Sequence, residues 1–207
     1  MYIPPAFREE DVEQLVAFMQ ANSFATLVSI RDGVPCASHV PLVVLRQENE
    51  IKLIGHLAKA NLQWRSFDAA ESLAIFTGAH AYISPALYEQ QENVPTWNYI
   101  AVHAYGKPEV ITLSRSRQLM ETLMDKMIDT YESAFKSHWH NFSDGYRTSM
   151  MNGIVAFEMT ITRLEGKYKL SQNRTQTDQQ NVANSLSESD DPAARSIALE
   201  MQKNLDK

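Results

Sequence analysis

The residues from Phe24 to Ile30 alternate between apolar and polar side chains, and Asp32-Gly33 follows them closely. A period of two predicts a half-buried β-strand, and Asp-Gly is a strong signal for a tight hairpin turn. The returning strand is predicted over residues 35–45. Strands joined by so short a turn pair in antiparallel order, because a parallel connection needs about a dozen residues or more. This hairpin therefore directs the chain toward an antiparallel sheet.

The remaining patterns predict more strands and a few helices. Strands are predicted over residues 50–56 and 71–77, on both sides of a loop at residues 85–95, and over residues 151–164. Helices are predicted over residues 9–21, 57–70 and 114–137, with two short helices in the tail from about residue 175. Since the early strands follow one another through short turns, we expect an α+β fold with a mainly antiparallel sheet. A small barrel with helices outside it is the simplest closure.

Composition narrows the class of protein. The chain has 207 residues, a formal net charge of −6 and a single cysteine, Cys36. This length favours one domain, and one cysteine cannot form an intramolecular disulfide. No apolar run reaches the roughly 18 residues of a membrane span, and the first residues lack the pattern of a signal peptide, so we expect a cytoplasmic protein. The acidic balance disfavours a protein that coats nucleic acid.

The stretch from His80 to Gly106 carries an unusual number of rings. One Trp, four Tyr and two His lie there together with Ser84 and Asn98. Such a surface suits a flat aromatic ligand with polar edges, because rings stack on its face and amides or hydroxyls bind its edge. The alternative is an aromatic sheet core whose polar tips are satisfied internally.

Two other segments could bind an anion. A strand ends near His56 and a helix is predicted to begin near Ala58, so that free N–H groups and Lys59 would attract a phosphate. Further along, Lys167, Lys169 and Arg174 place three cations within eight residues of an acidic protein. The alternatives are a surface lysine on an ordinary helix and a solvated turn that caps the final helices.

Several blocks of sequence together resemble the PaiB family of FMN-binding split-barrel proteins, over nearly the full chain. The blocks are residues 1–5, 22–29, 37–42, 55–61, 63–64, 78–84, 93–99, 102–106 and 169–174. This resemblance implies a six-stranded split barrel with flanking helices, and a homodimer that holds FMN in clefts between its subunits. Residues 1–174 would form this domain, with a helical insertion at about 114–150, and residues 175–207 a helical tail packed on it. The family name also implies a negative regulator of transcription.

The resemblance also assigns site residues. The flavin phosphate would meet Lys59, the Ala58 backbone and Asn61, and Ser38 and His39 would face the same cleft. The isoalloxazine ring would be bordered by His80, Tyr82 and Ser84, and Trp97 and Asn98 would come from the partner subunit or line the far wall. The site would be closed by Lys169, Ser171, Gln172 and Asn173. No side chain stands out as a catalytic acid or base, and no metal site is expected.

Three functions follow as hypotheses. The first is an FMN-dependent oxidoreductase or flavin-sensing protein linked to transcriptional regulation. The second is a repressor that binds DNA directly through basic residues between positions 112 and 147, namely Arg115, Arg117, Lys126, Lys136 and Arg147. The third is a haem-binding or haem-degrading split barrel, with His138 or His140 as the axial ligand.

Overall fold

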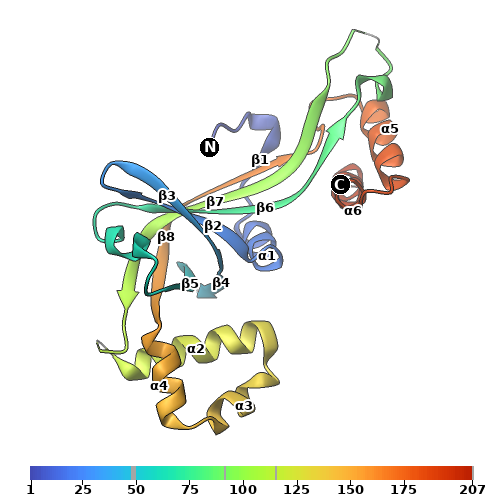
Figure 1. The fold of residues 1–207 in the computed structure, drawn as a ribbon. Helices are drawn as coiled ribbons and strands as arrows, with labels where there is room; N and C mark the ends of the chain where they lie inside the picture. Colours follow the sequence, from blue (N-terminus) through green and yellow to red (C-terminus); the bar gives the residue numbers. More distant parts are fainter. Residues whose placement is uncertain (48–49, 91, 115, 207) are drawn as a thin grey trace. The chain divides into compact units, whose positions relative to one another are not determined.

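The computed structural model describes residues 1–47, 50–90, 92–114 and 116–206. Arg115, one of the basic residues of the DNA-binding hypothesis, lies outside them. The chain forms two compact units (Figure 1). Unit 1 comprises Met1–Phe18, Thr77–Val102 and Glu165–Lys207, and unit 2 comprises Met19–Phe76 and His103–Leu164.

The fold is mainly antiparallel β with helices. The strands are β1 (Arg8–Glu9), β2 (Phe24–Arg31), β3 (Val34–Pro41), β4 (Val43–Gln47), β5 (Glu50–Ala58), β6 (Ser72–Ile83), β7 (Thr96–Ile111) and β8 (Ile154–Lys169). The α-helices are α1 (Val12–Ala21), α2 (Arg117–Glu132), α3 (Phe135–Asn141), α4 (Asp144–Asn152), α5 (Gln176–Ser187) and α6 (Pro192–Leu205). Short 3-10 helices are η1 (Pro5–Phe7), η2 (Leu62–Ser66) and η3 (Pro85–Leu87). Three long strands, β6, β7 and β8, contribute residues to both units.

The predicted hairpin is confirmed. Strands β2 and β3 pair in antiparallel register from Phe24↔Pro41 to Arg31↔Val34. The turn residues Asp32 and Gly33 have φ of 54° and 79°, the left-handed conformation that a two-residue hairpin turn needs and that Asp-Gly adopts readily.

The sheet does not close into a complete barrel. Its strand order is β3-β2-β6-β7-β8-β5-β4, and β1 pairs with β8 outside this path. The described strands thus number eight, where the family resemblance implies six. Strands β3 and β4 are the two ends of the path, so the closed barrel that the short turns suggested is replaced by an open, split arrangement.

Some predicted elements are wrong in kind or extent. The helix predicted over residues 57–70 is absent: β5 continues to Ala58, and only the short η2 follows. Polar side chains account for this, since Asn61 accepts the Gln63 N–H and Ser66 donates to the Gln63 carbonyl, bonds that compete with an α-helix. The strand predicted over residues 35–45 is divided into β3, which pairs with β2, and β4, which pairs with β5.

Two boundaries also move. The long helix predicted over residues 114–137 ends at Glu132 as α2, and α3 and α4 follow it. Strand β8 runs to Lys169, beyond the predicted end at residue 164, so Gly166 lies inside the strand. A Cβ at this position would lie 2.3 Å from Leu15 Cδ2 and 3.1 Å from the Glu9 carbonyl oxygen, so a larger residue would require the Leu15 side chain to move.

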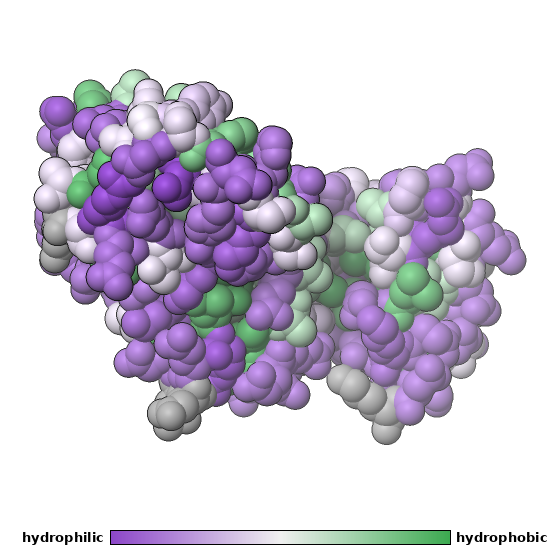
Figure 2. All heavy atoms as spheres, turned by 90° about the horizontal axis from the view of Figure 1, so that it is seen from below, coloured by the Kyte–Doolittle hydropathy of each residue, from purple (hydrophilic) through white to green (hydrophobic). Residues whose placement is uncertain are grey.

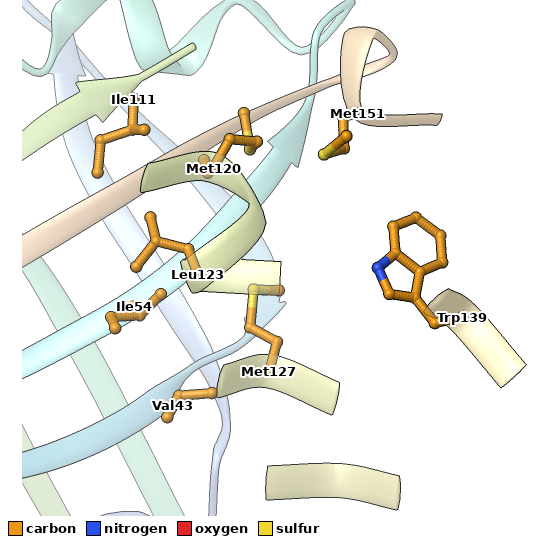
Figure 3. Packing of buried hydrophobic residues seen from close by; sticks show 9 residues of the cluster. Val43, Ile54, Ile111, Met120, Leu123, Met127, Trp139 and Met151 are labelled. Atoms are coloured by element: carbon orange, nitrogen blue, oxygen red, sulfur yellow. The ribbon is translucent and has the colours of Figure 1, made fainter. Parts of the chain in front are cut away.

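Unit 2 has an apolar core between its sheet and the inserted helices. Met120, Leu123 and Met127 project from one side of α2 toward Val43 and Ile54 of the sheet (Figure 3). Their spacing of three and four residues places them on one helix face. The cluster is completed by Ile111, Trp139, Met151 and Ala156.

Unit 1 buries one face of its strands. Helices α5 and α6 contact each other, and Met201 of α6 lies 3.5 Å from the amide nitrogen of Asn98 on β7. Asn98, Ile100 and Ile83 are buried, whereas Trp97 and Tyr82, their neighbours along β7 and β6, are each 52% exposed. Alternation along the strands thus gives unit 1 a covered face and an open one.

Most of the visible surface is polar. Figure 2 shows a face on which hydrophilic residues predominate and hydrophobic residues form small separate groups. Within the part of the chain that the structure describes, no helix combines the length and apolarity needed to cross a membrane.

The unit 2 core makes a direct prediction. Leu123→Ala is expected to lower the free energy of unfolding by about 2–5 kcal/mol, because it removes a fully buried side chain and leaves a cavity. Leu119→Ala on the same helix is the matched control, since Leu119 is 41% exposed and Leu123 1%. Urea titration of both variants measures the difference, and equal losses would contradict the assigned packing of α2.

Candidate functional site

The turn after β5 is held by hydrogen bonds of its own backbone. Lys59 donates its N–H to the Gly153 carbonyl (2.9 Å), and Asn61 donates its N–H to the Ala58 carbonyl (2.8 Å). The Gln63 N–H is taken by the Asn61 side chain. These donors are therefore already used, and no α-helix begins there to supply free N–H groups to an anion, so that a phosphate would depend on the Lys59 ammonium. The assignment of Ala58, Lys59 and Asn61 to a cofactor stays a prediction.

Gln63 organises the polar groups of this turn. Its side chain is 3% exposed and its Nε2 donates to the Leu27 carbonyl (2.9 Å) and to Ser29 Oγ (3.2 Å). Its Oε1 accepts the Ser38 hydroxyl at 2.6 Å, and Ser38 Oγ in turn accepts from Asn61 Nδ2 at 2.7 Å. One buried amide thus joins β2, β3 and η2, and the hydroxyl hydrogen of Ser38 is already committed.

Two side chains near Gln63 remain open to solvent. Lys59 is exposed, and no described carboxylate lies within ion-pair distance of its ammonium group. His39 is also exposed; its Nδ1 bonds to Thr26 Oγ1 at 3.0 Å and its ring stacks on Phe24, with centroids 6.3 Å apart. We define the first cluster as Ser38, His39, Lys59, Asn61 and Gln63. It offers one free ammonium group beside a rigid polar frame.

His56 lies on β5 just before this turn. Burial lowers the pKa of its imidazole, because a charged ring loses its hydration there. Its Nδ1 is buried and has no hydrogen-bond partner among the described residues. His56 was not among the predicted site residues.

A second cluster lies on the open face of unit 1. The Trp97 ring is contacted by His80 and by Tyr82, each with a centroid separation of 5.8 Å, and the Tyr82 contact is edge-on at 74°. His80, Tyr82 and Trp97 are all exposed. We call these three rings the aromatic platform. The predicted aromatic site residues are thus brought together.

Other predicted residues of this region are structural in the conformation observed. Asn98 is fully buried and exchanges hydrogen bonds with Ser171, at 2.9 and 3.3 Å. Both ends of the Gln172 amide bind backbone groups, at Leu170 and Tyr168. Ser84 caps η3 by accepting the Ala86 N–H. Ser84 and Gln172 are half-buried and Asn173 is exposed, and the assignment of all five residues to a cofactor stays a prediction.

Three cations border the aromatic platform or lie near it. Lys169 donates to Thr96 Oγ1 and to the carbonyl of Trp97. Burial lowers the pKa of the Lys169 ammonium, and the positive charges of Lys167 and Arg174 lower it further. Arg174 lies over the Tyr88 ring at 4.3 Å and donates to Asn93. Among the described residues, no carboxylate forms an ion pair with any of the three.

Sequence patterns missed several residues that hold these clusters. Gln63 and Thr96 were noticed only inside family blocks, and Asp178 was not noticed at all. Asp178 is 6% exposed and accepts the N–H of Glu89, which ties the loop after β6 to α5. The spacing Thr175-x-x-Asp178, which is typical of a helix N-terminus and which the Thr175 cap confirms, is the signal that could have found it.

The histidines of the haem hypothesis lie on α3. His138 packs edge-on against Phe142, with centroids 4.8 Å apart, and His140 Nε2 lies 3.1 Å from Asp125 Oδ1. Both imidazoles therefore have local partners, and their role as axial ligands stays a prediction.

The first cluster, in unit 2, offers an ammonium group, which suits a phosphate. The aromatic platform, in unit 1, offers exposed rings, which suit a planar aromatic group. The chain matches a family model described as "Putative FMN-binding domain" over residues 1–163. It is 38% identical to protease synthase and sporulation protein PAI 2 of Bacillus subtilis, with 100% of this chain and 99% of that protein covered. An uncharacterised protein of Emericella nidulans is 29% identical, covering 78% and 79%.

Solved structures show the same fold. The flavocytochrome Anf3 of Azotobacter vinelandii superposes with a TM-score of 0.60 at 14% identity, covering 78% of this chain and 69% of that one. The FAD and heme binding protein of Mycobacterium smegmatis gives a TM-score of 0.56 at 15% identity, covering 78% and 73%. This similarity establishes the split-barrel fold.

The Gln63 amide yields a stability prediction. Gln63→Leu is expected to lower the free energy of unfolding by about 2–4 kcal/mol, because buried acceptors on β2 and the Ser38 hydroxyl lose their partner. Gln118→Leu is the control, since Gln118 is exposed on α2. Denaturant titration measures both, and a loss for Gln63→Leu no larger than that of the control would show that this amide does not hold the strands.

The lowered pKa of His56 predicts a pH dependence. The unfolded chain binds a proton near pH 6.5 and the folded one only at lower pH, so stability is complete above about pH 6.5 and falls as the pH drops toward the folded pKa. His56→Leu should flatten the slope of unfolding free energy against pH in this range. Denaturant titrations of both proteins between about pH 5 and 7.5 test this, and identical slopes would refute it.

Proposed function

This chain belongs to the PaiB family of FMN-binding domains, and from that membership we propose that it binds FMN and acts as a flavin-dependent redox or flavin-sensing protein. The observation that carries the proposal is the exposed Lys59 ammonium beside the frame that Gln63 holds rigid. A cation on a fixed turn binds a phosphate with little loss of conformational entropy, because the surrounding groups are already ordered.

Each side chain of the first cluster has a distinct part in this proposal. Lys59 binds the phosphate of FMN, and Asn61 has a second amide hydrogen to offer beyond the one that it donates to Ser38. Ser38 orients Asn61, because its own hydrogen is donated to Gln63. His39 extends from the neighbouring strand as a further donor. The bound flavin supplies the electron transfer, and the protein binds and orients it.

We further propose that two copies associate as the family resemblance implies. Large apolar side chains are exposed on the β2–β3 hairpin, with Phe24 at 69%, Ile30 at 44% and Val34 at 63%. Strand β3 is also an end of the sheet path. An exposed apolar strand edge favours association with another chain. FMN would then lie at the subunit interface of a cytoplasmic homodimer.

The link to transcription remains part of the proposal, through flavin sensing in preference to direct DNA contact. Arg117 and Arg147 form ion pairs with Asp144, and Lys136 pairs with Asp129. These carboxylates compete with DNA phosphates for the cations of the inserted helices. An electrophoretic shift of promoter DNA at low salt, strengthened or weakened by FMN, would instead favour direct binding.

The phosphate contact gives a sharp prediction. Lys59→Gln is expected to weaken FMN binding about tenfold to a hundredfold, because a charge-assisted hydrogen bond contributes about 1.5–3 kcal/mol. Riboflavin, which lacks the phosphate, should bind wild type and variant equally. Quenching of flavin fluorescence on titration with protein measures both.

Lys107→Gln on β7 is the matched control, since Lys107 is also an exposed lysine. FMN and riboflavin binding the wild-type protein with equal affinity would contradict the phosphate site. Failure of NADH and NADPH to reduce the FMN-loaded protein without oxygen would contradict a reductase and leave flavin sensing.

A further inference from the structure

The aromatic platform is an open surface that the proposed phosphate site does not use. It lies in unit 1, on the face of β6 and β7 opposite the one that α5 and α6 cover. Trp97 and Tyr82 are each 52% exposed, although β6 and β7 are interior strands of the sheet, and they lie at the start of β7 and the end of β6. Exposed aromatic side chains in contact with one another commonly mark a binding surface.

Charge distinguishes this platform from an ordinary exposed apolar patch. Lys169 donates to the carbonyl of Trp97, so its ammonium group lies beside the backbone of β7 at the platform residue, 5.8 Å from the centroid of the Phe7 ring. Two of its three hydrogens bind Thr96 and Trp97, and the third is free for a ligand. Lys167 and Arg174 add positive charge nearby, and no described carboxylate pairs with these residues.

The arrangement favours a ligand whose ring and negative charge lie close together. The Lys169 ammonium attracts an anion, and the rings attract a planar apolar group. Lys167 and Arg174 are held by other partners, since Lys167 donates to the Tyr2 carbonyl and lies over the Tyr99 ring, and Arg174 donates to Asn93. FMN fits this less well, because its ribityl chain separates the phosphate from the ring and its oxidised ring is neutral. The family resemblance assigns His80, Tyr82, Trp97 and Lys169 to the FMN site.

We infer instead that the aromatic platform and Lys169 form a separate site for a compact aromatic anion, a ring that carries a carboxylate or a phosphate. Its ring stacks on Trp97 and its anionic group accepts the free hydrogen of Lys169. Such a molecule is the substrate class, or the effector class, of the flavoprotein proposed above, and this assignment of role rests on that proposed function. Binding itself does not require FMN.

Calorimetric titration of the full-length protein with four probes tests the site. The probes are 2-naphthoate, 2-naphthyl phosphate, the neutral 2-naphthalenemethanol and the non-aromatic cyclohexanecarboxylate. At least one naphthyl anion is expected to bind about tenfold more tightly than both the neutral alcohol and cyclohexanecarboxylate, because only it offers a ring and a charge together. Comparison of the two naphthyl anions shows whether a carboxylate or a phosphate is preferred.

Variants separate the contributions of ring and charge. Lys169→Gln should weaken the preferred anion about tenfold and leave the alcohol unchanged, Lys169→Arg should retain most of the affinity, and Trp97→Ala should weaken both aromatic probes. Lys203→Gln is the matched control, since Lys203 is an exposed lysine of the same unit. Circular dichroism of each variant confirms that it is folded.

Three outcomes would overturn the inference. Equal affinity for anion and alcohol would remove the role of the cations, and an unchanged anion affinity in folded Lys169→Gln would remove that of Lys169. One-to-one displacement of the naphthyl anion by FMN would show that the platform holds the flavin itself. In each case FMN binding that depends on Lys59 would leave the proposed function intact, whereas a naphthyl anion bound by a protein that never binds FMN would refute the proposed function alone.

Discussion

Alternation along the β-strands is the constraint on which the rest of this structure depends. Successive side chains of a strand point to opposite faces of the sheet. When helices cover one face, every second side chain therefore lies on the uncovered face. On β7 this rule buries Asn98 beneath α6 and leaves Trp97 at the surface. Neighbouring residues of one motif therefore serve different ends, one as part of the interior and one as a place where a ligand can bind.

Local conformation and local hydrogen bonds decided which predictions from the sequence were correct. The hairpin at Asp32-Gly33 was predictable because both residues tolerate the left-handed conformation that the turn imposes. The helix expected over residues 57–70 failed because its decisive bonds involve the side chains of Asn61 and Ser66, which a count of apolar periodicity ignores. Local bonding of polar side chains is the information that such patterns lack.

The candidate site shows the same division. The aromatic residues and Lys169 could be singled out from their types and spacing, and the structure brings them together. Asn98 and Ser171 could not be told apart from ligand-binding residues, because only the fold shows that they bind each other. Gln63 was overlooked since a single glutamine has no distinctive sequence signal, although its contacts span β2, β3 and η2.

The contacts of Gln63 also limit which side chain this position of the chain can hold. A carboxamide offers a donor at one end and an acceptor at the other, and both ends are engaged here. A glutamate would turn an oxygen toward the Leu27 carbonyl, where two acceptors repel, and would bury a negative charge. Slow deamidation of Gln63 would convert it to glutamate and have the same effect. Because the side chain is only 3% exposed, water has little access to the amide, and the surrounding strands protect it from this hydrolysis.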